Sequence, residues 1–135
     1  MPNRRPNDET LDQKLLRTKR RRYQKEKDGQ IYMIRGRLRN GDVIWKLGRS
    51  VDGERRIRQH KARCRIARWT TKTIWDVKKY VRTEALIHIR LQMLGFQHYE
   101  RECPCGVNHD EWFTYANSRT GMRNVRDVVA EYEYH

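Results

Sequence analysis

The sequence predicts a small domain of the mixed α/β class (α+β), in which a β-hairpin leads directly into a helix. Two short runs rich in apolar and β-branched residues, residues 31–34 and 43–47, lie on either side of Asn40 and Gly41. Asn-Gly between two such runs is a strong hairpin signal, because both residues tolerate positive φ. The charged stretch that follows has the apolar spacing of a helix, and a β-branched and aromatic segment comes after it. Strands and helices therefore alternate along a chain that, at 135 residues, has the length of one domain.

The register of the hairpin determines which side chains share a face of the sheet. A two-residue turn at Asn-Gly pairs Lys46 with Arg35 and places Lys46 on the face opposite Tyr32, because side chains alternate along a strand. A longer loop around residues 36–42, or a bulge, places Tyr32 and Lys46 on the same face. Both registers agree with the sequence.

The first helix is expected over residues 53–63, with Ser50 or Asp52 as its N-cap. Arg56 and His60 lie four residues apart within it, which places them on one helix face. The hairpin and this helix therefore carry several candidate functional side chains.

A strand or extended connection is expected over residues 66–77, and a long helix from Asp76 to about Leu94, with Gly95 as its C-terminal cap. Glu84 falls on the inward, apolar face of this long helix. A carboxylate on such a face needs a partner or a metal ion. Glu84 is therefore a candidate functional acid, and an ion pair with an arginine such as Arg56 is the structural alternative.

The two ends of the chain differ in character. Residues 1–28 are polar and basic, and they predict a flexible tail that precedes a domain over residues 29–135. The alternative is a basic arm that contacts phosphates or serves as a nuclear localisation patch, and Leu11, Leu15 and Leu16 could give it one weak helical face. Near the other end, residues 111–115 predict a further strand, and Asn117 or Ser118 can start a final helix.

The net charge of +14 predicts a polyanionic partner. Between Arg55 and Arg82 there are eleven Lys or Arg residues and one acid, Asp76. A surface of one sign repels itself unless an anion neutralises it, so DNA is the expected partner and RNA the second candidate. The residues expected to contact nucleic acid are Arg49, Arg55, Arg58, Lys61, Arg63, Arg65 and Arg68.

Membrane and secreted classes are disfavoured by the same sequence. No run approaches the ~20 apolar residues of a membrane span, and residues 1–8 lack the apolar core of a secretory signal. Three cysteines do not make a disulfide framework, which favours a reducing compartment. An intracellular protein without a membrane partner is expected, nuclear in a eukaryote and cytoplasmic otherwise.

Several short motifs follow one another along the chain. They are Ile31-Tyr32, Lys46-Leu47-Gly48-Arg49, Arg55-Arg56, Cys64, Glu84, Ile87-His88, Cys103-Pro104-Cys105-Gly106, His109 and Glu111-Trp112-Phe113. Over about residues 29–130 this order resembles the GIY-YIG nuclease superfamily, most closely its branch of phage DNA-binding domains and fungal proteins related to a meiotically up-regulated gene product. The resemblance implies a three-stranded antiparallel sheet flanked by helices, and the hydrolysis of phosphodiester bonds.

The resemblance also implies a role for each candidate catalytic residue. Tyr32 is the base or water-positioning group, Arg56 stabilises charge on the reacting phosphate, and Glu84 holds one divalent cation, expected to be Mg²⁺. His60 matches a position that is His or Tyr in some active members. Lys46 is a cation that helps the Tyr32 phenol to ionise, since the unperturbed pKa of a phenol is roughly 10. A single carboxylate suits Mg²⁺, which keeps several waters and takes another ligand from the substrate phosphate.

Cysteine and histidine residues form a second candidate metal site. Cys103, Cys105 and His109 are close in sequence, and Cys64 at the end of the first helix could complete a Cys₃His set. Structural zinc favours such a tetrahedral set, and His98 is an alternative fourth ligand. The other interpretation is three reduced cysteines without a metal ion.

Two functions from different classes follow from these observations. The first is a Mg²⁺-dependent endonuclease that acts on DNA. The second is a non-catalytic DNA-binding module with the same fold, which uses the basic surface between Arg55 and Arg82. A component that binds RNA through the same charge is a third hypothesis.

Overall fold

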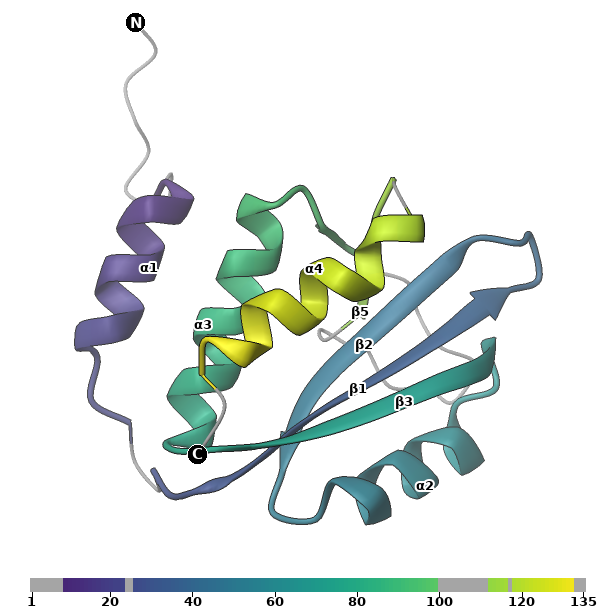
Figure 1. Ribbon diagram of the computed structural model, residues 1–135, viewed down its shortest axis with the longest axis horizontal. Coiled ribbons are helices and arrows are strands. Elements are labelled where there is room, and N and C mark those ends of the chain that lie inside the picture. The colour runs from purple at the N-terminus through teal and green to yellow at the C-terminus, as the bar shows by residue number, and fades with distance from the viewer. Residues whose placement is uncertain (1–8, 24–25, 100–111, 117, 133–135) are drawn as a thin grey trace, which may run out of the picture.

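The computed structural model describes residues 9–23, 26–99, 112–116 and 118–132 (Figure 1). They contain both helices and the strands of one antiparallel sheet, which confirms the mixed α+β class. The helices and strands are α1 (Leu11–Arg20), β1 (Gly29–Leu38), β2 (Val43–Ser50), α2 (Gly53–Arg63), β3 (Ala67–Val77), α3 (Tyr80–Met93), β4 (Gln97–His98), β5 (Trp112–Thr114) and α4 (Ser118–Ala130). No helix among these residues is long and apolar enough to cross a lipid bilayer.

The strands form one antiparallel sheet of five strands in the order β3-β1-β2-β5-β4. The expected count of three strands was therefore wrong, although β3, β1 and β2 are the three long ones. The short strands β5 and β4 extend the sheet beyond β2, where β5 pairs with β2 at residues 44–46. The two-residue strand β4 has no alternating pattern that a sequence could reveal.

Helices cover both faces of this sheet, with α2 on one face and α3 and α4 on the other (Figure 1). Odd-numbered residues of β1 and β2, such as Met33 and Trp45, are buried in the larger core together with apolar residues of α3 and α4. Even-numbered residues, such as Tyr32 and Ile34, are buried against Ile57 of α2. The strict alternation assigns each strand residue to one of two separate layers.

The hairpin has the longer of the two loops considered. Residues 38–42 reverse the chain: the amide of Leu38 donates to the carbonyl of Asp42, and Gly41 has φ of 92°. Lys46 therefore lies opposite Ile34 rather than Arg35. Directly opposed residues of antiparallel strands share a face, so Lys46 lies on the same face as Tyr32, two residues from Ile34.

Helix α2 has the expected bounds, and the side chain of Asp52 caps it by accepting from the amide of Arg55 at 3.2 Å. Helix α3 begins at Tyr80 and not at Asp76, because Asp76 still pairs with Gln30 in the sheet. At its other end Gly95 has φ of 101°, which confirms the expected glycine cap.

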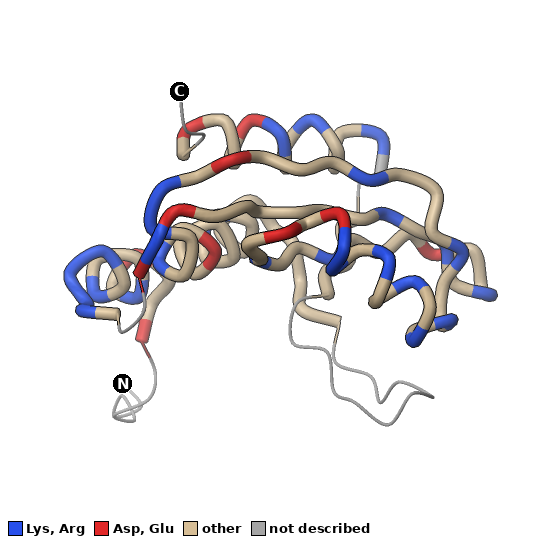
Figure 2. The backbone as a smooth tube through the Cα atoms, turned by 90° about the horizontal axis from the view of Figure 1, so that it is seen from below, with Lys and Arg blue, Asp and Glu red and all other residues tan. Residues whose placement is uncertain are grey.

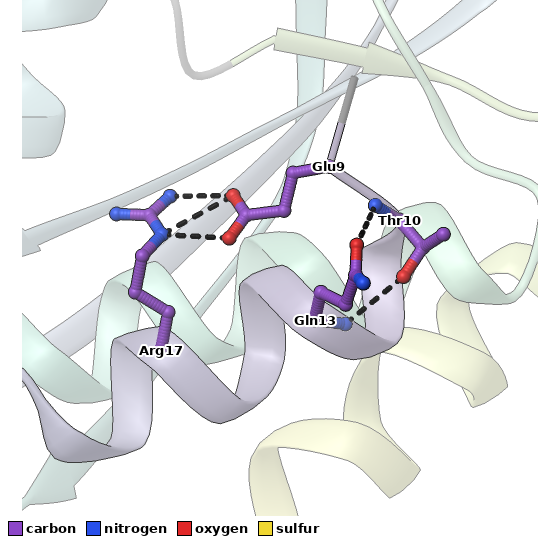
Figure 3. A network of polar contacts seen from close by, with 4 residues as sticks. All are labelled: Glu9, Thr10, Gln13 and Arg17. Atoms are coloured by element: carbon purple, nitrogen blue, oxygen red, sulfur yellow. Dashed lines mark hydrogen bonds and ion pairs between the residues drawn. The ribbon is translucent and has the colours of Figure 1, made fainter. Parts of the chain in front are cut away.

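The N-terminal segment contains a helix where a flexible tail was expected. Thr10 and Gln13 form a capping box, in which each side chain accepts a hydrogen bond from the backbone amide of the other residue (Figure 3). Helix α1 then lies along α3, and Thr18 is buried between other side chains (Figure 1). The capping box Thr-x-x-Gln was the signal in the sequence, and packing against α3 supplies the stability that a short isolated helix lacks. The division of the chain at residue 28 stays a prediction.

Candidate functional site

Two of the candidate catalytic residues form a buried polar contact between the sheet and α2. Nζ of Lys46 lies 2.8 Å from Nδ1 of His60, and the two residues are 2% and 5% exposed. A protonated Lys46 donates to Nδ1 of His60, in which case the proton of the neutral ring is on Nε2. The contact holds the His60 ring against Lys46.

Tyr32 lies on the same face of the sheet as this pair. It is 1% exposed, faces Gly48 across the hairpin, and packs in one cluster with Ile57 of α2. Arg56, one helical turn before His60, is exposed on α2. The structure thus places Tyr32, Lys46 and His60 together in the layer beneath α2, with Arg56 on its surface.

Glu84 lies in the other layer, on α3. It is 7% exposed, and its carboxylate accepts a hydrogen bond of 2.9 Å from Nη1 of Arg49. Nε2 of His88, four residues further along α3, is 3.7 Å from the same carboxylate. The structural alternative for Glu84 was thus right in kind, but its arginine partner is Arg49 rather than Arg56.

Both groups meet the same short stretch of β2, residues 47–49. Tyr32 is opposite Gly48, while Nε2 of His88 donates to the carbonyl of Leu47 at 2.9 Å and Glu84 binds Arg49. Because β5 pairs with β2 only at residues 44–46, no described strand covers this edge at residues 47–49. The candidate residues thus converge on one sheet edge from opposite faces of the sheet.

A groove of about 510 Å³ opens beside Glu84, between α1, α3 and the end of β2. Its polar lining includes Glu84, His88 and Arg49, together with Lys14, Arg17 and Arg21 from α1 and the residue that caps it. Glu84 is the one carboxylate among the described lining residues, against four basic side chains. The groove therefore combines an acid with a rim of positive charge.

Burial lowers the pKa of His88 to about 4, from an ordinary value of 6.5, and the nearby positive charges of Lys14 and Arg49 act in the same direction. The hydrogen bond to the carbonyl of Leu47 acts in the opposite direction and is outweighed. His88 is therefore neutral at physiological pH and serves as a fixed donor to β2.

This shift predicts a loss of stability in acid. A histidine that is neutral in the folded protein and ordinary in the unfolded chain stabilises the fold above pH 6.5, and this contribution decreases as pH falls toward 4. We expect the metal-free protein to lose up to ~3 kcal/mol of unfolding free energy over this window. His88→Gln keeps a donor and cannot titrate, so urea unfolding of this variant should show a shallower pH dependence. Parallel curves for the two proteins would contradict the assignment.

The residues expected to contact nucleic acid do not form one surface. Arg55, Arg58, Lys61 and Arg63 lie on α2, Arg65 lies in the connection after it, and Arg68 is the second residue of β3. All are exposed except Lys61, which is half-buried. Arg49 is the exception in position, because it lies at the groove beside Glu84. The remaining six define the α2 basic surface.

The described residues test neither of the two metal predictions. Among the described residues no group of three or more His, Cys, Asp or Glu side chains is arranged to hold a metal ion. Cys64 is fully buried with Ile44 and Trp112 at the end of α2. Its proposed zinc partners, at positions 103, 105 and 109, lie outside the described residues. The zinc site stays a prediction, as does Mg²⁺ at Glu84.

Sequence reasoning missed the contribution of α1 to the groove. Lys14, Arg17 and Arg21 are spaced by three and four residues, which is the spacing of one helix face. That spacing was a usable signal, but the basic composition of residues 1–28 suggested an unstructured tail.

Comparison with known families identifies the family of this chain. The family model of the T5orf172 domain matches residues 29–133. The T5orf172 domain is a nuclease-like, DNA-binding domain family, so DNA binding and a nuclease-type function agree with the match at a coarse level. Neither the curated proteins nor the solved structures gave a match.

The assignment to the GIY-YIG superfamily was therefore wrong, because the family that matches is the T5orf172 domain and no GIY-YIG model does. The motifs that suggested it are short, and packing explains part of them. Ile31 and Leu47, for example, are buried in the core that any hairpin covered by helices would form. The roles of Tyr32, Lys46 and Glu84 must be argued from geometry alone.

Proposed function

The chain belongs to the T5orf172 domain family, and we propose that it is a DNA-binding endonuclease that hydrolyses phosphodiester bonds with one divalent cation. The observation that carries this proposal is the position of Glu84. A carboxylate that is 7% exposed faces a groove of about 510 Å³ whose other charged side chains are basic. Metal-assisted phosphodiester hydrolysis requires a carboxylate that holds the cation and basic side chains that hold the phosphate.

Glu84 is the proposed ligand of Mg²⁺, which would polarise a phosphate oxygen and stabilise the charge that develops there. One protein carboxylate is enough for this ion, which retains several waters. Arg49 now binds Glu84 at 2.9 Å, and its planar guanidinium can turn to a phosphate instead. The ion pair therefore keeps the guanidinium of Arg49 next to the position proposed for the scissile phosphate.

The layer beneath α2 supplies the remaining proposed roles. Tyr32 is the proposed water-positioning group, and Lys46 provides a positive charge on the same face. Both lie on the sheet face opposite Glu84, so this role requires the Tyr32 hydroxyl to become accessible at the open edge of β2. His60 acts as a positioning residue, because it holds Lys46 at 2.8 Å. Arg56, exposed on α2, donates to a phosphate of the bound strand.

DNA binding itself is assigned to the α2 basic surface. Six of the Lys and Arg residues that are coloured blue in Figure 2 belong to α2, to the connection after it and to the start of β3. Phosphate contacts of this kind give affinity without base specificity, and they weaken steeply with salt.

Cleavage of supercoiled plasmid DNA tests the proposal. We expect nicking in Mg²⁺ that stops when EDTA is added, with products that separate from the intact plasmid on an agarose gel. Binding of the same DNA should persist in EDTA. Cleavage that is equal in Mg²⁺ and EDTA would overturn the role of the cation.

A non-catalytic DNA-binding module is the second candidate, and the Arg49–Glu84 ion pair favours it. The pair neutralises the only described carboxylate of the groove without any metal ion. Binding without cleavage in Mg²⁺ on both plasmid and branched DNA would establish this function in place of the first.

A further inference from the structure

Helix α1 lies outside the residues that match the family model, yet it forms one wall of the groove. The match covers residues 29–133, whereas Lys14, Arg17 and Arg21 precede it and line the groove opposite Glu84 and Arg49. This chain therefore adds a basic wall to the site of its family domain.

The three basic side chains lie on one face of α1. Positions 14, 17 and 21 are separated by three and four residues, so their side chains follow one another along the helix. Lys19 and Arg20 are exposed and do not line the groove. The basic residues of α1 are thus divided between a groove side and a solvent side.

Polar contacts fix this wall in place at both ends. At the start of α1, Glu9 accepts from Nε and Nη2 of Arg17 at 2.9 Å each, which leaves Nη1 directed away from Glu9 (Figure 3). Just after α1, Nη2 of Arg82 on α3 donates to the carbonyl of Arg21 at 2.7 Å. Glu26 in turn accepts from the amides of Val81 and Arg82 at 3.1 Å. The connection of α1 to α3 is therefore specific rather than loose.

The positive charge of the groove favours an anionic ligand. The one described carboxylate of the groove, Glu84, is already paired with Arg49, and Arg17 is paired with Glu9 outside the groove lining. The described groove lining therefore holds no acid that balances Lys14 and Arg21, and Nη1 of Arg17 adds a donor beside them. From position 14 to position 21 the helix rises ~10 Å. One DNA strand carries a phosphate about every 3.4 Å along the duplex axis, so the length of the wall corresponds to about three phosphates.

We propose that the α1 wall, defined as Lys14, Arg17 and Arg21, binds the sugar–phosphate backbone of one DNA strand and holds it beside Glu84. The inference deepens the proposed function and rests on it for the identity of the partner as DNA. It assigns two separate contacts to the DNA: the α2 basic surface on one side of the sheet, and the α1 wall on the other. The two lie on different sides of the molecule (Figures 1 and 2).

The test compares two triple variants that remove the same charge from the same segment. Lys14→Gln/Arg17→Gln/Arg21→Gln removes the wall, and Lys19→Gln/Arg20→Gln/Arg22→Gln is the control, since none of these three lines the groove. Glutamine has a helix propensity close to that of Lys and Arg, and circular dichroism checks that both variants keep their helices. Affinity for a short DNA duplex is measured by fluorescence anisotropy over a series of salt concentrations.

Each phosphate contact contributes roughly 0.9 to the slope of log affinity against log salt. We expect the wall variant to lower the slope by about 2 to 3 and the control to lower it by less than half as much. Equal effects of the two variants, or an unchanged slope in the wall variant, would overturn the proposal. Lys14→Gln/Arg21→Gln retains the Glu9–Arg17 ion pair and tests the same point if the triple variant unfolds.

The outcome for the wall can be separated from the outcome for the proposed function. Suppose that the unaltered protein cleaves DNA in a metal-dependent way and that the slope is unchanged in the wall variant. DNA binding by the α1 wall would then be excluded, and the nuclease function would be retained. If the slope of log affinity against log salt is lowered in the wall variant and the unaltered protein does not cleave DNA, the α1 wall would be part of a non-catalytic DNA-binding module.

Discussion

Glu84→Gln is expected to lower Mg²⁺-dependent DNA cleavage by about 100-fold or more, because a single bound cation supplies several kcal/mol of transition-state stabilisation. Glutamine has the shape of glutamate and keeps one oxygen that can accept from Arg49, but it lacks the charge that holds Mg²⁺. Plasmid nicking rates measured at saturating DNA report this loss directly. Affinity for the same DNA in EDTA should change little, since the α2 basic surface is untouched.

Glu54→Gln is the matched control for this prediction. Glu54 lies on α2, on the other face of the sheet, and is half-exposed in an ion pair of 3.0 Å with Lys72. The substitution changes the net charge by the same amount, so a general effect of charge on DNA affinity appears in both variants. Unaltered cleavage in Glu84→Gln would exclude Glu84 as the ligand. An equal loss of cleavage in both variants would exclude it as well.

The sequence predicted those parts of the fold that have local signals. Asn40-Gly41 located the hairpin, Asp52 located the start of α2, and Gly95 marked the end of α3 because its left-handed conformation suits glycine. Each of these features depends on a few neighbouring residues.

Features that depend on distant contacts were missed. The start of α3 moved from Asp76 to Tyr80, because the partner strand β1 holds residues 76 and 77 in the sheet. Helix α1 is stable because α3 packs against it, and the pairing of β4 with β5 joins residues 97–98 to residues 113–114. Tertiary contacts of this kind override the local preference.

In the candidate site, too, features with a local sequence signal were predicted and features that depend on distant contacts were not. The hydrophobic pattern placed Glu84 on the inward face of its helix, and the structure confirms that it is buried. Its partner could not be predicted, because Arg49 reaches Glu84 only when β2 and α3 pack together. Tyr32 and Glu84 lie on opposite faces of the sheet, and this likewise depends on which face each helix covers. Composition and spacing do not encode that choice of face.

Trp45→Ala is expected to lower the free energy of unfolding by about 3–5 kcal/mol, the usual cost of removing a large aromatic ring from a core. Trp45 is 1% exposed on β2, where its ring meets that of Phe96 edge-on at a centroid distance of 5.6 Å. Its indole Nε1 has no hydrogen-bond partner among the described residues. Trp45→Phe should therefore cost less than half as much, because packing and not a hydrogen bond is lost. Urea denaturation followed by circular dichroism measures both values, and equal losses would contradict this reason.

The contact between Trp45 and α4 allows a sharper test of how α4 packs on the sheet. A Cβ atom added at Gly121 would lie 2.5 Å from Cζ2 of Trp45, so Gly121→Ala should destabilise the protein by forcing the ring aside. A phenylalanine ring at position 45 does not extend to the position of Cζ2, and Gly121→Ala should then cost less. A double-mutant cycle of Gly121→Ala and Trp45→Phe should give a coupling of about 1 kcal/mol or more, since the two residues are in contact. Strict additivity would show that α4 is not held against β2 by this contact. The support that α4 gives to α3, and through it to Glu84, would then have to come from other residues of the core.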